Sequence, residues 1–228
     1  AIHRHRAMEL ARAGYSTLNS LIEANINELK EVPSIGSVLA SRIKEYVEYF
    51  IGDRSKRKYQ SQIRRAKELG RDTEIIEKLY KETGDNFSKV CSDIFCGMEL
   101  SCKFIGDLNP HDPDCLIESD EGRIVIECKR EKGKNLVSAK EAEEIRGKGA
   151  KYRPIAEITV GYPDFSNNAI NNVKNTHITL ITHTVLAEIL IKFWEGKITK
   201  DKIIEILKSG KYINEDYVNN LLFFETEH

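Results

Sequence analysis

Several common features are missing from this sequence of 228 residues, and each absence excludes a class of protein. No apolar stretch approaches the ~18 residues that a membrane-spanning helix needs, so we expect no membrane partner. No signal peptide is visible, which favours a cytoplasmic location. The phosphate-binding pattern Gly-x-x-x-x-Gly-Lys-Ser/Thr is absent as well, so we do not expect these residues to hydrolyse ATP.

Cysteine is scarce, and its spacing argues against a metal cluster. The five cysteines include no Cys-x-x-Cys pair. Four residues separate Cys91 from Cys96, and five separate Cys96 from Cys102. Cys115 and Cys128 fall on predicted strands, where small buried side chains fit. We therefore expect reduced, buried thiols in place of a zinc or iron–sulfur site, and no disulfides in a cytosolic protein.

A large excess of either charge is also missing, because the formal net charge is −1. The charge is uneven along the chain, however, and residues 54–71 hold eight basic residues against one acid, Glu68. Such a segment can supply the phosphate contacts that dominate affinity for DNA, but a solvated linker helix is an equally good interpretation. The basic residues are Arg54, Lys56, Arg57, Lys58, Arg64, Arg65, Lys67 and Arg71, of which Arg57, Lys58, Arg64 and Arg65 are our candidates for DNA binding.

Residues 113–129 carry the most informative pattern. Two short apolar runs, 115–117 and 124–126, flank a polar segment, Ser119-Asp120-Glu121-Gly122, that is rich in turn-forming residues. Short apolar runs around such a turn predict a β-hairpin.

The predicted hairpin brings three polar side chains together. If the turn is centred between residues 120 and 121, Asp114 lies opposite Glu127. Side chains alternate along a strand, so Glu127 and Lys129 share a face. All three groups should then meet at one end of the hairpin, across a strand separation of about 5 Å.

These side chains suit metal-dependent cleavage of a phosphodiester bond. Mg²⁺ prefers oxygen ligands and keeps several of its waters, so Asp114 and Glu127 are candidate ligands. Lys129 can orient an attacking water or stabilise negative charge on the phosphate. The simpler alternative is an ordinary hairpin that ends in a surface ion pair.

The same residues resemble a known motif. Pro113-Asp114 followed by Glu127-Cys128-Lys129 resembles the PD-(D/E)xK signature of the restriction-endonuclease-like nucleases. The segments 133–137 and 142–145 follow the lysine as a glycine-containing loop and a helix do in the FokI-type cleavage domain. The resemblance extends over residues 110–213 and includes His177-Ile178-Thr179, Val185-Leu186 and Glu195-Gly196-Lys197-Ile198-Thr199.

The resemblance implies a mixed sheet flanked by helices and DNA cleavage that depends on Mg²⁺ or Mn²⁺. It also implies a homodimer for cutting both strands. Many relatives carry a Glu on the first core helix just after a Phe, but this chain has Ser88 there, and Glu82 or Asp93 are the candidate substitutes. Asp112 can be a further ligand or a polar neighbour. On a predicted helix over 139–151, Lys148 can approach phosphate.

The first third of the chain predicts a pair of helices. Leu18 to Leu29 give an apolar helical face, and Pro33 ends that helix because proline lacks an amide donor. Gly36 permits a tight, left-handed turn. A second amphipathic helix follows from Val38 to Phe50.

This pair resembles a helix-hairpin-helix motif, with Ser34 where such hairpins usually have Gly. Backbone N–H groups near the start of the second helix form a natural phosphate site. A helix pair that only packs or binds protein is the alternative. The candidate DNA-binding residues are Pro33, Ser34, Ile35, Gly36, Ser37, Arg42 and Lys44.

Residues 1–16 predict a basic helix closed by Gly14. Together with the hairpin, they resemble the C-terminal domain of archaeal Ski2-like DNA repair helicases. The chain begins at Ala1 without Met, so we expect part of a larger protein with a helicase motor in the same full-length chain.

We therefore predict an α/β protein in which a small all-α domain precedes a restriction-endonuclease-like core. The predicted parts are a helix-hairpin-helix domain (1–52), a basic linker helix (53–71) and a nuclease domain (72–228). The predicted function is a metal-dependent DNA endonuclease module of a DNA repair or helicase protein. A non-catalytic DNA-binding accessory module and a protein-interaction module are the alternatives.

Overall fold

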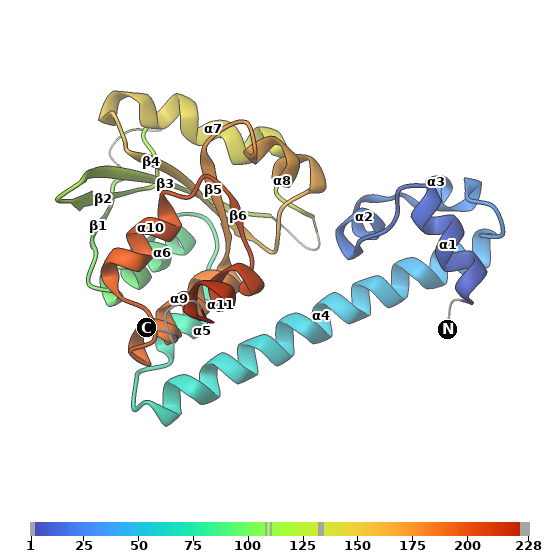
Figure 1. Cartoon of the computed structure of the whole chain (residues 1–228), viewed down its shortest axis with the longest axis horizontal. Helices are drawn as coiled ribbons and strands as arrows, with labels where there is room; N and C mark the ends of the chain where they lie inside the picture. Colours follow the sequence, from blue (N-terminus) through green and yellow to red (C-terminus); the bar gives the residue numbers. More distant parts are fainter. Residues whose placement is uncertain (1–2, 108, 110, 132–134, 224–228) are drawn as a thin grey trace. The chain divides into compact units, whose positions relative to one another are not determined.

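The computed structural model describes residues 3–107, 109, 111–131 and 135–223. The chain forms two compact units, Ala1–Arg57 and Lys58–His228. Helix α4 (Ser37–Glu68) begins in the first unit and ends in the second (Figure 1). Among the described helices, none combines the length and the apolar character needed to cross a membrane.

The first unit is all helical and packs around its own small core, which includes Leu10, Leu29 and Ile43. The single helix predicted from Leu18 to Leu29 is wrong, because two short helices stand there. Asn25 explains the break: its side chain accepts from the amides of residues 27 and 28 and starts a new helix. The helices before α4 are α1 (Arg4–Arg12), α2 (Leu18–Glu23) and α3 (Ile26–Glu31).

The turn before α4 departs from prediction in one detail. The residue in the left-handed region is Ser34, with φ of 67°, and Gly36 does not have a positive φ. The backbone thus uses this conformation at the position where helix-hairpin-helix motifs usually carry Gly. Gly36 instead accepts the amide of Ala40 at 2.9 Å and begins the helix.

A six-stranded mixed sheet forms the centre of the second unit, in the order β1-β2-β3-β4-β5-β6. The first three strands pair antiparallel, and β3 to β6 pair parallel. The strands are β1 (Ser101–Phe104), β2 (Cys115–Ser119), β3 (Gly122–Arg130), β4 (Ala156–Tyr162), β5 (Ile178–Thr182) and β6 (Tyr212–Ile213).

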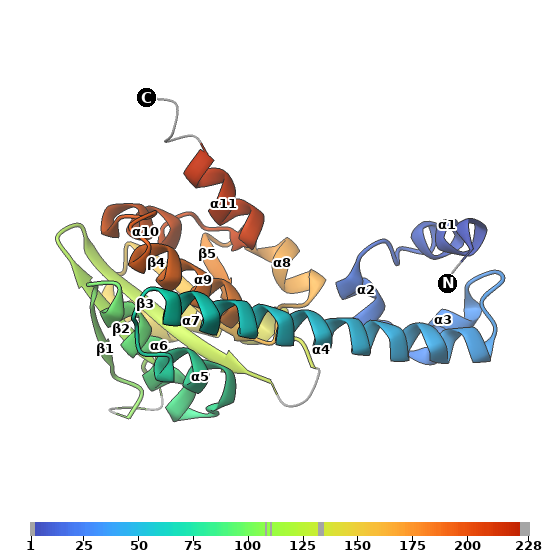
Figure 2. The same ribbon diagram turned by 90° about the horizontal axis from the view of Figure 1, so that it is seen from below.

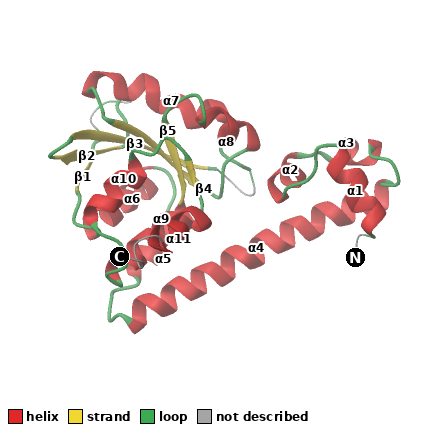
Figure 3. Ribbon diagram, viewed as in Figure 1, coloured by secondary structure: helices red, strands yellow, loops and turns green. Residues whose placement is uncertain are grey.

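Helices cover both faces of this sheet, which confirms the predicted fold class (Figure 3). On β3, Ile124 and Ile126 face the larger core with α6 and α9, whereas Val125 faces the smaller core with α7 and α8. The helices are α5 (Glu74–Lys81), α6 (Asp85–Gly97), α7 (Ala139–Gly149), α8 (Asn167–Val173), α9 (His183–Trp194), α10 (Lys200–Leu207) and α11 (Glu215–Phe223), with a 3₁₀ turn at Ala150–Tyr152.

Cys91, Cys102 and Cys115 are buried as predicted, but Cys96 is exposed and Cys128 only half-buried. The glycine of the expected loop at 133–137 lies outside the described residues.

Neither α8 nor β6 was predicted. Helix α8 contains four asparagines, which are poor helix formers, and β6 is only two residues long.

The C-terminal half of α4 lies beside α5 and α9 (Figure 2). Its anchor is Arg65, whose guanidinium binds both carboxylate oxygens of Glu188 at 2.7 and 2.9 Å. The same group donates to Glu195 at 2.9 Å. The side chains of these acids are 8% and 14% exposed, so Arg65 neutralises two largely buried charges.

Replacement of Arg65 by Leu should therefore destabilise the second unit. We expect the R65L substitution to lower the free energy of unfolding by about 2–4 kcal/mol, because two carboxylates lose their partner in a partly buried site. Arg64→Leu is the matched control, since that side chain is 72% exposed and its nearest acid lies at 3.8 Å; its effect should stay within about 0.5 kcal/mol. Equal losses in urea denaturation would contradict the assignment.

Candidate active site

The β2–β3 hairpin has the register that the sequence predicts. Cys115 pairs with Ile126 and Ser119 with Gly122, so Asp114 stands opposite Glu127. Gly122 takes a φ of 139° at the turn, a value that a side chain would strain. The two carboxylates therefore meet at the end of the hairpin that is remote from its turn.

Glu127 is the buried centre of the cluster, with 1% of its surface exposed. Its Oε1 accepts from Lys148 Nζ at 2.5 Å and lies 2.9 Å from Lys129 Nζ. Its Oε2 is buried and has no hydrogen-bond partner among the described residues. An unpaired buried carboxylate oxygen is costly, so this atom marks a position where a cation is favoured.

Helix α7 supplies the groups that surround these lysines. Glu144 binds the ammonium of Lys129, and Lys148 lies four residues further along the same helix face. Burial lowers the pKa of Lys129, but the carboxylates of Glu144 and Glu127 outweigh it and leave the pKa raised. Lys129 is therefore a firmly held cation.

A glycine permits this close approach of α7 to the sheet. A Cβ atom at Gly149 would lie 2.9 Å from Val125 Cγ2, which is closer than real contacts allow. The last turn of α7 thus rests directly on β3. Lys148, the preceding residue, is thereby brought within reach of Glu127.

Asp114 occupies a different environment from Glu127. Its Oδ2 accepts the backbone amide of Cys128 at 2.7 Å. Burial, followed by the nearby Cys128 sulfur and the Glu127 carboxylate, raises the pKa of Asp114 to about 7. Each of these effects disfavours the charged form, and a bound cation would reverse them.

These groups open onto a pocket of about 320 Å³ between α6 and α7. Besides the hairpin residues and Lys148, its lining includes Asp85 and Ser88 from the first turn of α6. Glu82 and Asp93, the predicted sources of a third carboxylate, do not line it. Asp85 was missed because it stands at the helix N-terminus, ahead of the position where sequence patterns place the Glu.

Asp112 lies outside this pocket. It is 6% exposed, and its carboxylate pairs with Lys151. The structure therefore favours the polar-neighbour interpretation of Asp112. Lys148 was predicted only as a phosphate contact, and its place against Glu127 follows from α7 packing that the sequence does not reveal.

The donor set fits a hard divalent cation that keeps several waters. Asp114 and Glu127 offer carboxylate oxygens, and Glu127 Oε2 is free to bind. Across the described ranges, no group of three or more His, Cys, Asp or Glu side chains is arranged to hold a metal. Two protein carboxylates completed by water and phosphate oxygens match the way Mg²⁺ binds.

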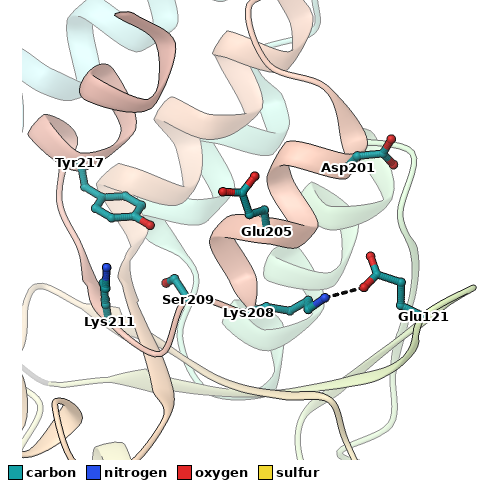
Figure 4. A pocket seen from close by; sticks show the side chains of 7 residues that line it. All are labelled: Glu121, Asp201, Glu205, Lys208, Ser209, Lys211 and Tyr217. Carbon is teal, nitrogen blue, oxygen red and sulfur yellow. Dashed lines mark hydrogen bonds and ion pairs between the residues drawn. The ribbon is translucent and has the colours of Figure 1, made fainter. Parts of the chain in front are cut away.

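A second cavity, of about 440 Å³, lies near the turn of the hairpin (Figure 4). Glu121 and two acids on α10, Asp201 and Glu205, line it, and Lys208 pairs with Glu121. The carboxylate of Glu205 in turn lies 2.9 Å from Lys202 Nζ. These acids are exposed, so the cavity offers no buried carboxylate comparable to Glu127.

The predicted hairpin residues of the first unit divide into two groups. Pro33, Ser34, Gly36 and Ser37 are exposed, as is Arg42, whereas Ile35 is 2% exposed and belongs to the core.

Lys44 is a correction to the predicted phosphate contacts. Its ammonium donates to the carbonyls of Leu21, Ile22 and Ala24 at 3.2, 2.6 and 2.8 Å. All three donors are thereby used on the end of α2. Lys44 is a structural clamp between α2 and α4.

All four candidate DNA-binding residues of the basic stretch pair with acids. Arg57 and Arg64 pair with acids one turn away on α4 and stay largely exposed. Lys58 binds Glu215 at 2.5 Å, and Arg65 is held as described above. Arg57 and Arg64 are therefore the better-placed cations for a phosphate.

Residues 79–190 match a family model described as "Restriction endonuclease". No curated protein matches the chain. Among solved structures, the chain is similar to that of restriction endonuclease FokI, with a TM-score of 0.52, 13% identity, and coverage of 63% of this chain and 31% of that chain. The chain thus spans about a third of FokI.

This likeness establishes a restriction-endonuclease-like fold for the second unit. The matched family model indicates a nuclease.

The raised pKa of Asp114 makes a testable contribution to stability. Because this pKa is about 7 in the folded protein, and near 3.9 in an unfolded chain, its stability contribution is lost as pH rises from about 4 to 7. In EDTA, the free energy of unfolding of wild type should therefore fall between pH 5 and pH 8 by up to about 3 kcal/mol more than that of Asp114→Asn. Asp120→Asn, at the exposed turn, should behave like wild type in urea titrations. Parallel pH profiles for wild type and Asp114→Asn would contradict the assignment.

Proposed function

We propose that the chain is a divalent-metal-dependent DNA endonuclease module that uses Mg²⁺ or Mn²⁺. The observation that carries this proposal is the buried Glu127 carboxylate, opposite Asp114 and beside Lys129, with one oxygen unpartnered in a restriction-endonuclease-like fold.

Each residue has a distinct role in this proposal. Asp114 and Glu127 hold the cation, which when bound lowers the pKa of a water and stabilises charge on the phosphate. Lys129, fixed by Glu144, orients the attacking water or meets negative charge on the phosphate. Lys148 places a second positive charge in the same pocket.

The first unit supplies DNA binding in this proposal. The exposed residues Pro33, Ser34, Gly36 and Ser37 lie at the start of α4, where N–H groups favour phosphate, and Arg42 and Arg57 add exposed charge. The resemblance of the first unit to archaeal Ski2-like helicases supports a place in DNA repair, with a helicase motor as a neighbour in one chain. Cutting both strands would call for a homodimer.

One observation favours a second candidate, a non-catalytic DNA-binding accessory module. Ser88 stands where many relatives carry a Glu, and Asp85 is the remaining acid that α6 offers to the pocket. The intact set of Asp114, Glu127 and Lys129 supports the active enzyme over this alternative.

Cleavage of single-stranded, duplex and forked DNA tests the proposal. With Mg²⁺ or Mn²⁺, we expect cuts that fall by at least about 100-fold in D114A and E127A, because each change removes a ligand of the cation. Glu121→Ala is the matched control, since it changes an exposed acid at the other end of the same hairpin. Salt-sensitive DNA binding without metal-dependent cutting would favour the accessory module.

Lys148 allows a separate test of metal binding. Because its ammonium neutralises Glu127 at 2.5 Å, it competes with a cation for that carboxylate. Lys148→Met should therefore bind Mn²⁺ at least about 3-fold more tightly in calorimetry, while it cleaves DNA more slowly. Lys208→Met, which frees Glu121 at the hairpin turn, is the control and should leave both unchanged. Weaker Mn²⁺ binding in Lys148→Met would contradict the assigned site.

A further inference from the structure

Helix α4 presents exposed aromatic rings in the first unit. Tyr46 is 67% exposed, Tyr49 is 72% exposed and Phe50 is 37% exposed. The adjoining strip of the helix is buried, with Ile43 and Val47 in the core. Tyr46 and Tyr49 therefore lie largely outside the core of the first unit, although exposed rings of this size are costly to keep in water.

Basic side chains share the face that carries the rings. Steps of three and four residues link Arg42 to Tyr46, then to Tyr49 and Phe50, and onward through residue 53 to Lys56 and Arg57. We call this face, with Arg42, Tyr46, Tyr49, Phe50, Lys56 and Arg57, the aromatic stripe.

The charge of the stripe is positive. Asp53, the acid within it, is bound by Arg57 at 2.5 Å, and the exposed Glu45 lies at its edge, three residues from Arg42 and four from Tyr49. Arg42 and Lys56 are exposed and form no ion pair with any residue in the described ranges. Both therefore offer charge to an anionic partner.

Two of the rings are nearly parallel. The centroids of Tyr46 and Phe50 are 6.4 Å apart, and the ring planes differ by 23°. Exposed rings of this kind offer flat faces on which unpaired bases can stack.

We infer that the aromatic stripe binds an unpaired segment of the DNA substrate. Bases stack on the rings of Tyr46 and Phe50, and the phosphates that flank them meet Arg42 and Lys56. These two cations are separated by about 21 Å along the helix, which accommodates several nucleotides. Duplex DNA cannot use the rings in this way, because its bases are already stacked and paired.

This inference rests on the proposed function, since it names the part of a DNA substrate that the first unit recognises. A protein segment is a poorer occupant, because cations flank the rings at both ends of the face. An apolar partner would leave those charges unpaired, whereas a single strand satisfies both kinds of group.

Fluorescence anisotropy with the full chain in EDTA tests the inference. The probes are a labelled 15-nucleotide oligo-dT and a labelled 15-base-pair duplex. In the double variant Tyr46→Leu with Phe50→Leu, apolar area is kept and the rings are lost. We expect the oligo-dT Kd to rise about 10-fold or more, and the duplex Kd to change less than about 2-fold.

Val38→Ala is the matched control, because it removes another exposed apolar side chain, 68% exposed, from the same helix without removing a ring. It should leave both Kd values unchanged. Circular dichroism and thermal unfolding should be the same for wild type, the ring variant and Val38→Ala.

A second variant, Arg42→Gln with Lys56→Gln, tests the cations. The slope of log Kd for oligo-dT against log salt concentration should fall by about 0.7 per charge removed.

Three results would overturn the inference. The first is an unchanged oligo-dT Kd in the ring variant, and the second is an equal loss for duplex. The third is a change of oligomeric state in the ring variant with unaltered oligo-dT binding, which would assign the stripe to a second copy of the chain. Metal-dependent cleavage by wild type is measured separately, so failure of the inference is distinct from failure of the proposed nuclease.

Discussion

The candidate active site depends on one buried carboxylate shared by two lysines. Glu127 is almost fully buried, and its Oε1 is neutralised by Lys129 and Lys148 while Oε2 has no partner. A buried carboxylate of this kind is tolerated only beside cations. The arrangement of α7 follows from this constraint, because α7 supplies Lys148 and also Glu144, which fixes Lys129.

The hairpin could be predicted from sequence because its geometry is local. Alternation with a period of two and a turn at fixed length determine which residues face each other, so the pairing of Asp114 with Glu127 needed no tertiary information. Glu144, Lys148 and Asp85 could not be assigned this way. Their positions depend on how α6 and α7 pack on the sheet, and only the contact of Gly149 with β3 shows how closely α7 approaches.

The basic residues of α4 show a different limit of sequence analysis. The sequence does not show whether a basic side chain binds a phosphate or a carbonyl group. Lys44 donates to three backbone carbonyls. Arg65 likewise meets two carboxylates, while its neighbour Arg64 remains exposed. Net charge therefore overstates the surface available to DNA. The exposed rings of α4 indicate a recognition surface that charge counting alone would miss.

Crystals of the chain soaked with Mn²⁺ would test the central claim most directly, through the anomalous scattering of the ion. We expect a peak in the pocket between α6 and α7, bonded to Asp114 and to Glu127 Oε2, with Lys148 displaced from Oε1. Mn²⁺ bound by these two carboxylates would show that this fold holds the cation that the proposed cleavage requires. A peak among Glu121, Asp201 and Glu205, with none beside Glu127, would contradict the account.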